Sequence, residues 1–372
     1  MGKADVNFAK LSTKLTSAFS WPEVGLENWG AIVDSKKRAT LRDVALLAET
    51  SVGTVSNVLN RPAYVNEDLR KRVLLAMRLL KFEPTLTARK YRKGRAINVG
   101  LVLADMSNPF FTSISVSAES ETRNINAGLV MCHSAEDVGR EAQNIELLIQ
   151  HRVQGIILAP VSNMDQNFKK LVQRNFPVVL VDRVPTKFTG CSVTTDDFEG
   201  GRIAGKHLKD LGFKKIAFLS NPSKSEKMKQ RIAGFHEAFE GVDSGFTFEL
   251  IKIENWSFAD GVVAGNAIAK RAKEYLPRAI FCANDLVAMG LLQSLQRAKI
   301  EVPSDVAIMG FDDIHAASEV SIPITTLRQP LDELGRLAMR LLYEEISQTG
   351  EHVHTQRMLP PELVIRESTK GS

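Results

Sequence analysis

Residues 40–61, TLRDVALLAETSVGTVSNVLNR, carry two short amphipathic segments separated by a polar turn. Apolar side chains of the first segment recur at helical spacing, and Thr40 stands three residues before Asp43 as in a capping box. This predicts a helix that begins at Leu41. Residues 49–51 form the turn, and the serine that ends it is placed to cap a second helix. The stretch therefore predicts a helix-turn-helix, whose second helix would fit a DNA major groove.

Short side chains form the predicted outer face of the second helix, so its backbone would be able to approach base edges closely. Asn57 is suited to bond an adenine through its two-sided amide. A third helix is predicted after Asn66, because apolar residues from Leu69 to Leu80 repeat at helical spacing and would close a small core. Other pairs of amphipathic helices share this pattern, so a purely structural role stays open. The residues expected at DNA are Thr40, Val52, Gly53, Thr54, Ser56, Asn57 and Asn60.

Charge separates this region from the rest of the chain. The 372 residues hold 48 Lys and Arg against 43 Asp and Glu, a net charge of +5. Residues 36–95 hold 15 Lys and Arg against 5 Asp and Glu, a net of +10, which leaves −5 for all other residues. A basic module on a mildly acidic body favours phosphate binding, because each neutralised phosphate releases condensed counterions.

The segment TLRDVALLAETSVGTVSNVLNRPAYVNEDLRKRVLLAMRLLKFEPTLTARKYR resembles the lactose-repressor (LacI/GalR) family of bacterial transcription regulators. The resemblance continues through NPFF, VTTDDFEGG, QRIAGFH, FCANDLVAMG, VAIMGFDD and TTLRQPLDELG, and covers roughly residues 39–368. It implies a helix-turn-helix DNA-binding domain at 39–84, a hinge helix or linker at 85–96, and an effector-binding and dimerisation domain at 97–372. The effector-binding domain is implied to have two Rossmann-like lobes, like a periplasmic binding protein. The first lobe is implied to comprise residues 97–195 and 330–357, and the second residues 196–329 and the C-terminus.

Three features depart from the family pattern. In the implied hinge, Tyr91 stands where the residue that wedges into the minor groove is usually leucine, whereas Arg89 still favours phosphate contact; both are expected at DNA. Without DNA this segment is expected to be a disordered basic linker. Glu49 replaces a usual glycine, so it must tolerate the turn backbone and brings negative charge close to DNA. Residues 1–38 lack a clear period and are expected to be a disordered tail or a start-site artefact, with Val33 as initiator.

From Asn98 onward, short apolar runs alternate with amphipathic segments. Each run is typical of a buried strand followed by a helix, which predicts α/β architecture with parallel sheets. Hydrophobic residues make up 44% of the chain, enough for such a core. The runs are NVGLVL (98–103), GLVMC (128–132), GIILA (155–159), VVLV (178–181), KIAFL (215–219), AIFC (279–282) and VAIM (306–309).

Polar residues follow several of these runs, where open α/β sheets bind ligands. Carboxylates, amides and aromatic rings there would suit a sugar, sugar acid or sugar phosphate. The same residue types also cap helices, and paired phenylalanines are usually core, so each candidate has a structural alternative. The candidates by position are Asp105, Asn108, Phe110, Asp182, Arg183, Asn284 and Asp312. The resemblance implies effector contacts for Asp182, Arg231, Asn284, Asp312 and Gln329, with Arg231 the strongest because its planar guanidinium suits carboxylates, phosphates and vicinal hydroxyls.

Enzyme motifs are incomplete. GGRIAGK at 200–206 matches part of a phosphate loop, but His207 follows where serine or threonine would hold magnesium, and the segment lies in a predicted helix. The sequence has no GxGxxG after a strand and no GxSxG. We therefore expect no catalytic residue and no cofactor.

Metal-binding patterns are also incomplete. Three widely spaced cysteines, Cys132, Cys191 and Cys282, form neither a disulfide framework nor a zinc motif. His352 and His354 share one face of a late strand, but no third ligand is evident in the sequence, so no metal is expected.

The protein is expected to be a sequence-specific transcriptional regulator that acts as a repressor. It would bind a near-palindromic double-stranded operator as a homodimer, with a tetramer as alternative, and a small polar effector between the lobes would control it. No apolar run has the length of a membrane span and no secretion signal is evident, so we expect a cytoplasmic protein without a membrane partner. The alternative is a solute-binding or sensing module without a DNA role, which leaves the basic head unexplained.

Overall fold

The computed structural model describes residues 39–60, 64–80, 82, 97–161, 166–185, 188–221, 225–241, 245–348 and 352–370. The chain divides into two compact units, residues 1–95, here called the head, and 96–372, the body. The expectations for the extension at 1–38 and for the hinge, with Arg89 and Tyr91, lie outside the described residues. No helix in the described part of the chain is long and apolar enough to cross a membrane.

The described head is a three-helix unit of α3 (Leu41–Leu47), α4 (Val52–Asn60) and α5 (Glu67–Leu79). The three predicted helix starts are confirmed, because each cap forms. Thr40 and Asp43 make the reciprocal bonds of a capping box. The Thr54 amide donates to Ser51 Oγ at 3.0 Å, and the Asp68 amide donates to Asn66 Oδ1 at 2.9 Å. A single core forms between the helices, to which Val44, Val55 and Val73 each contribute a fully buried side chain.

The first lobe of the body contains a six-stranded parallel sheet in the order β11-β5-β4-β3-β1-β2. Helices α6 and α14 cover one face, and α7 and α8 cover the other. The strands are β1 (Ile97–Leu103), β2 (Ala127–His133), β3 (Gly155–Leu158), β4 (Val178–Val181), β5 (Cys191–Thr195) and β11 (Gln356–Leu359). The helices are α6 (Pro109–Thr122), α7 (Val138–Gln150), α8 (Gln166–Gln173) and α14 (Leu331–Ser347).

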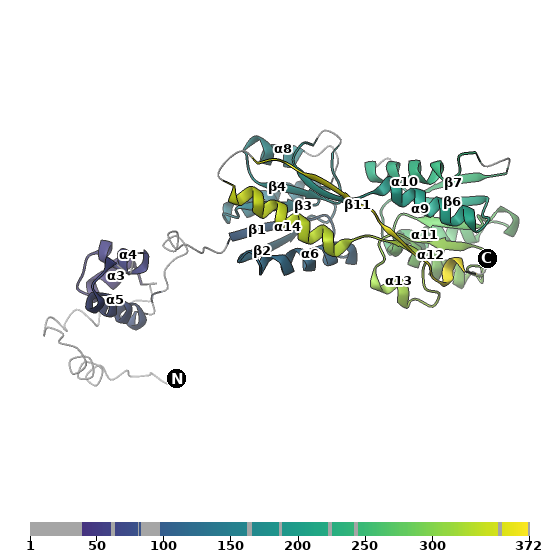
Figure 1. Cartoon of the computed structure of the whole chain (residues 1–372). Coiled ribbons are helices and arrows are strands. Elements are labelled where there is room, and N and C mark those ends of the chain that lie inside the picture. The colour runs from purple at the N-terminus through teal and green to yellow at the C-terminus, as the bar shows by residue number, and fades with distance from the viewer. Residues whose placement is uncertain are drawn as a thin grey trace, which may run out of the picture. The chain divides into compact units, whose positions relative to one another are not determined.

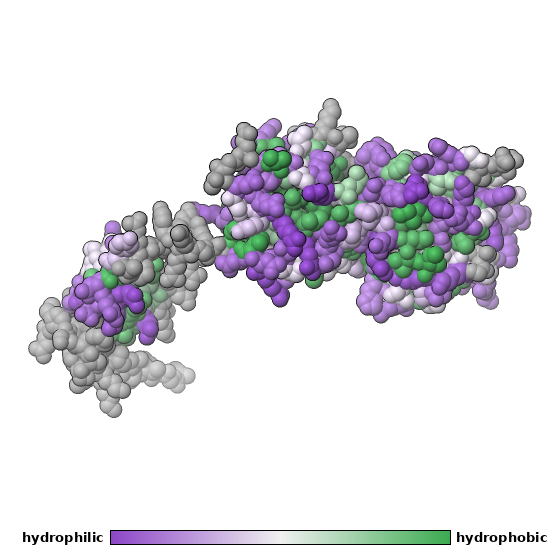
Figure 2. Space-filling model, viewed as in Figure 1, coloured by the Kyte–Doolittle hydropathy of each residue, from purple (hydrophilic) through white to green (hydrophobic). Residues whose placement is uncertain are grey.

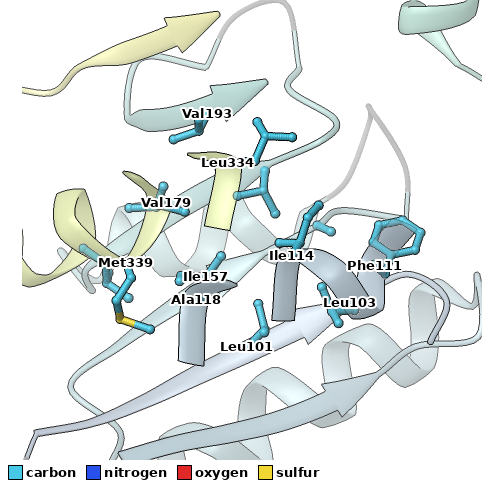
Figure 3. Packing of buried hydrophobic residues seen from close by; sticks show 14 of the residues in the cluster. Leu101, Leu103, Phe111, Ile114, Ala118, Ile157, Val179, Val193, Leu334 and Met339 are labelled. Carbon is cyan, nitrogen blue, oxygen red and sulfur yellow. The ribbon is translucent and has the colours of Figure 1, made fainter. Parts of the chain in front are cut away.

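Side chains alternate across this sheet as strand geometry requires. Leu101 and Leu103 of β1 point into the layer of α6 and α14, where they lie near Ala118 and Ile114 of α6 (Figure 3). Val102, between them, packs into the opposite layer. Both faces of the sheet are thus covered, which explains why β1 has an almost uninterrupted apolar sequence.

The second lobe contains a four-stranded parallel sheet in the order β7-β6-β8-β9. Helices α9 and α10 pack on one face, and α11 and α12 on the other. The strands are β6 (Lys215–Ser220), β7 (Thr247–Lys252), β8 (Ala279–Cys282) and β9 (Ala307–Met309), and an antiparallel pair joins β10 (Thr326–Arg328) to β12 (Glu362–Val364). The helices are α9 (Asp197–Asp210), α10 (Glu226–Glu237), α11 (Phe258–Ala269), α12 (Asp285–Arg297) and α13 (His315–Glu319), and short 3-10 turns lie at Lys273–Tyr275 and Glu367–Thr369.

The chain passes between the lobes after β5, before α14 and after β11 (Figure 1). The helical placement of residues 200–206 is confirmed, and their glycines serve packing. A Cβ on Gly201 of α9 would collide with the Arg231 carbonyl, and one on Gly234 of α10 would collide with the Phe198 carbonyl. The two helices therefore approach each other closely, which fixes the backbone that carries Arg231.

The fold class is confirmed as a helix-turn-helix head and a two-lobed α/β body with parallel sheets. All seven predicted strands form, but the expectation of burial is wrong for β2: Val130 and Met131 are 43% and 48% exposed because β2 is an edge strand. Strands β5, β7, β10 and β12 were not predicted, since β7 alternates between polar and apolar residues and the others are short. The late strand expected at His352 and His354 begins instead at Gln356, as β11. Hydrophilic residues cover most of the described surface visible in Figure 2.

Candidate DNA-binding face and effector site

The outer face of α4 has the solvent exposure that a helix needs in order to contact DNA bases. Val52, Gly53 and Asn57 are exposed, whereas Thr54 and Ser56 are half-buried. Val55 and Val58 of the same helix are buried in the head core, so the two faces are clearly distinct. Thr40 is exposed but already caps α3, and the side chain of Asn60 lies outside the described residues.

The turn between α3 and α4 contains a non-glycine residue in left-handed conformation. Glu49 has a φ of 50°, and its amide donates to the Leu46 carbonyl at 3.2 Å. Its carboxylate lies 4.0 Å from the Arg72 guanidinium, an exposed pair of low energetic weight. The expectation that Glu49 must tolerate a backbone suited to glycine is therefore confirmed.

Replacing Glu49 with glycine is expected to stabilise the head by about 0.5–1 kcal/mol, because relief of the left-handed strain exceeds the added flexibility of glycine. Hydrogen exchange of the α3 and α4 amides in the full chain would measure this gain. Glu49→Gln is the matched control, since it removes the charge and keeps the strained backbone. Equal protection in the two variants would show that the φ of Glu49 carries no cost.

Five polar residues of the body, here called the interlobe cluster, come together from both lobes: Asp182, Lys227, Arg231, Asp312 and Gln329. Lys227 of α10 donates to the carboxylate of Asp182, which follows β4 in the other lobe. Gln329 donates through Nε2 to Asp312 Oδ1 at 2.6 Å and accepts from Thr195 Oγ1 at 2.5 Å. Direct hydrogen bonds therefore connect the lobes at this point.

Arg231 makes many internal contacts. Its side chain is 1% exposed and donates to Asp197 through Nε, at 3.1 Å, and through Nη2. Nη1 donates to the Ala283 carbonyl at 2.6 Å, and the guanidinium lies 3.3 Å from the centroid of the Phe311 ring. These contacts give Arg231 a structural role in the second lobe in addition to the effector contact that the sequence predicts.

The structural alternative applies to two of the other candidates. Asn108 caps α6 through the Phe110 amide at 3.0 Å, and Asn284 caps α12 through the Val287 amide at 3.0 Å. Asp105 accepts hydrogen bonds from Ser107 within its own loop. These three candidates therefore lie at strand ends, as predicted, with local bonds already formed.

Phe110 and Arg183 lie closer to the interlobe cluster. The Phe110 ring is buried in the first-lobe core, and Lys227 Nζ lies 5.6 Å from its centroid. Arg183 pairs with both carboxylate oxygens of Glu136, at 2.8 and 2.9 Å, and its guanidinium lies 5.1 Å from the centroid of the Trp256 ring.

Sequence reasoning missed Lys227, Trp256 and Thr195. Lys227 lies four residues before Arg231, so helical periodicity places both on the same face of α10 and was the available signal. Trp256 and Thr195 had no comparable signal, because only the packing of the lobes brings Trp256 to Arg183 and Thr195 to Gln329.

A cavity of about 410 Å³ adjoins the interlobe cluster and includes Asp312 and Gln329 in its wall. Ser113 comes from the first lobe, whereas Asp313 and Arg328 come from the second, so the cavity opens between the lobes. Its other lining residues are Pro330, Leu331, Asp332 and Glu333. Carboxylate, guanidinium and amide groups of this wall are able to bond a hydrophilic ligand, and apolar surface lies between them.

Asp312 has an unusual proton affinity for a carboxyl. Burial raises the pKa of Asp312 to about 7, although Lys227, Arg231 and the Gln329 hydrogen bond oppose the shift. Because the folded state then binds a proton more tightly than the unfolded state, Asp312 contributes most stability at low pH, and this contribution is lost as pH rises toward 7.

The Asp312→Asn variant tests this sign. Between pH 8 and pH 6, the free energy of unfolding of the wild type should rise by about 1.4 kcal/mol relative to that of the variant. Parallel urea titrations at the two pH values would give the difference, in which contributions from groups that do not interact with Asp312 cancel. A pH-independent difference would mean that Asp312 titrates far from neutrality.

Two family models match the chain. Residues 40–85 match the bacterial regulatory proteins of the lacI family, and residues 206–369 match the periplasmic binding protein-like domain. Among curated proteins, the HTH-type transcriptional repressor PurR of Photobacterium profundum is 31% identical over 341 residues, 89% of this chain and 99% of that protein. PurR of Haemophilus influenzae (strain PittEE) is 31% identical over 337 residues, 90% and 99% of the respective chains.

Solved structures show the same architecture. The lac repressor dimer bound to operator and the anti-inducer ONPF has a TM-score of 0.74 and 25% identity, covering 90% of this chain and 99% of that one. The complex of the transcriptional regulator CelR with cellobiose has a TM-score of 0.64 and 26% identity, covering 89% and 100%. A ribose-bound regulator from Enterococcus faecalis V583 has a TM-score of 0.64 and 30% identity, covering 73% and 98%.

Proposed function

The chain belongs to the LacI family of DNA-binding transcriptional regulators, and from this premise we propose that it represses transcription from a near-palindromic operator as a homodimer. The exposed face of α4 carries this proposal. Its side chains are short around Asn57, while the opposite face of α4 is fixed in the head core. Such a helix is able to place an amide against an adenine edge in the major groove.

The controlling ligand is a small polar molecule of the sugar class that binds at the interlobe cluster. Two arguments support this class. The cluster offers carboxylate, amide and ammonium groups suited to hydroxyls, and it adjoins a cavity of about 410 Å³. Two structural relatives hold sugars, cellobiose in one and ribose in the other.

Ligand control follows from the bonds that join the lobes. Lys227 bonds to Asp182 across the lobes, and Thr195 bonds to Gln329, which bonds to Asp312. A ligand hydroxyl that replaces one of these partners removes a bond between the lobes. It therefore changes the free energy of this lobe arrangement relative to a second arrangement without the bond. Coupling to the head then requires only that the two arrangements differ in operator affinity.

Selection of bound sequences from a random DNA pool tests the DNA part of the proposal. The purified full chain is incubated with the pool at fixed salt, because phosphate contacts alone give salt-dependent binding without sequence preference. We expect enrichment of a near-palindromic sequence. Adding ribose or cellobiose to the selection should change the fraction of this sequence that the protein binds. If sugar bound without any enriched DNA sequence, a solute-sensing module in the cytoplasm would replace the regulator.

A further inference from the structure

A second cluster of functional side chains lies in the first lobe, and it shares no residue with the interlobe cluster. Cys191, Glu345, His352 and His354 each offer one ligand atom, and these atoms all lie within 4.8 Å of one another. No third ligand for His352 and His354 is evident in the sequence, whereas the structure places Cys191 and Glu345 beside them. Parallel pairing of β11 with β5 brings Cys191 to the histidines, and α14 brings Glu345.

Two separations between ligand atoms of the cluster are close to those of a tetrahedral metal centre. Cys191 Sγ lies 3.1 Å from His352 Nε2 and 3.6 Å from His354 Nδ1. Zinc bonds of about 2.3 Å to sulfur and about 2.0–2.1 Å to nitrogen, at a tetrahedral angle, separate the two atoms by roughly 3.6 Å. One observed separation has this value, and the other reaches it with a small side-chain movement.

Neighbouring groups support ligation. His352 Nδ1 lies 3.0 Å from Gln348 Oε1, so Gln348 is placed to accept the ring proton and leave Nε2 facing the sulfur. The Thr355 amide donates to Cys191 Sγ at 3.4 Å. Glu345 Oε2 is buried and has no hydrogen-bond partner among the described residues.

We propose that Cys191, Glu345, His352 and His354 bind one zinc-class divalent transition-metal ion per chain. One thiolate and one carboxylate would neutralise the two positive charges, which limits the cost of placing the ion in a half-buried site. Thiolate and imidazole ligands select zinc and cobalt over magnesium and calcium, which prefer oxygen. The ion would join the end of α14 to β5 and to the segment that enters β11, and so stabilise the first lobe.

Cobalt titration of the reduced, untagged full chain, first freed of metal with a chelator, tests the proposal. We expect one equivalent of cobalt to produce a thiolate-to-cobalt charge-transfer band and the visible bands of tetrahedral coordination, and zinc to abolish both. Zinc should also raise the thermal midpoint of the wild type. A cobalt titration without the charge-transfer band would overturn the proposal, and the Cys191 contacts would then be thiol–imidazole hydrogen bonds.

Matched variants assign the ligands. Cys191→Ser should lose the charge-transfer band and the zinc-induced thermal shift, whereas Cys132→Ser, which changes another first-lobe thiol, should keep both. His354→Ala should weaken cobalt binding by at least about tenfold. Circular dichroism establishes that each variant is folded before titration. A band that survives in folded Cys191→Ser would place the metal elsewhere and refute this site.

Discussion

Replacing Arg231 with methionine is expected to lower the free energy of unfolding of the second lobe by about 3–5 kcal/mol. The substitution leaves the buried Asp197 carboxylate without its cation and the Ala283 carbonyl without its donor. It also removes the guanidinium from the Phe311 ring. Urea unfolding would measure the loss. With Trp21 and Trp29 replaced by phenylalanine, fluorescence would report on Trp256, the remaining tryptophan, which lies in the second lobe.

Arg271→Met is the matched control for this experiment. Arg271 bonds to Glu249 through its two terminal nitrogens, Nη1 and Nη2, in the same lobe, but the pair is exposed, so its loss should cost at most about 1 kcal/mol. The double variant Arg231→Met with Asp197→Asn should recover part of the loss, because it removes the uncompensated charge. If Arg231→Met cost no more than Arg271→Met, Arg231 would be available to the effector without any structural penalty.

Asn57→Ala is expected to relax base preference at one position of each operator half-site, with a loss of about 1–3 kcal/mol on the preferred sequence. The physical reason is the loss of an amide able to donate to and accept from one adenine edge. Asn57 is exposed on α4, so its truncation should leave the head folded. Binding to a set of operators changed one base pair at a time would locate the affected position.

Lys71→Ala provides the comparison, because Lys71 is an exposed cation on α5 whose described partner is Glu67 at 3.1 Å. Any effect of its charge on DNA affinity should be equal for all sequences and should decrease with salt. An equal loss on every operator for Asn57→Ala as well would mean that Asn57 contacts the backbone of the DNA rather than a base.

The head was predictable because its signals are local. Thr40, Ser51 and Asn66 each cap a helix within three residues of their own position, so the sequence alone contains both partners of each bond. The parallel sheets were also predictable, since buried strands leave long apolar runs. Edge strand β2 differed from the prediction only in its burial, which depends on its place in the sheet and not on its own residues.

The candidate sites were predictable only in part, because their bonds are long-range. The positions of Asp182 and Asp312 followed from the ends of predicted strands. The sequence did not show that Lys227 reaches Asp182 from the other lobe. Arg231 and Asp197 are 34 residues apart, and nothing local pairs them. Cys191 and His352 are separated by 161 residues, and β11 brings them together by adding to the edge of β5 late in the chain.

The late arrival of β11 also bears on how the protein is made. During translation the strand edge of β5 stays open until residue 359 has left the ribosome, although β1 to β4 are complete far earlier. Open strand edges favour pairing with other chains. The second lobe meanwhile has its whole four-stranded sheet once residue 309 has emerged. Between the emergence of residue 309 and that of residue 359, the nascent first lobe therefore exposes an open strand edge after the sheet of the second lobe is complete.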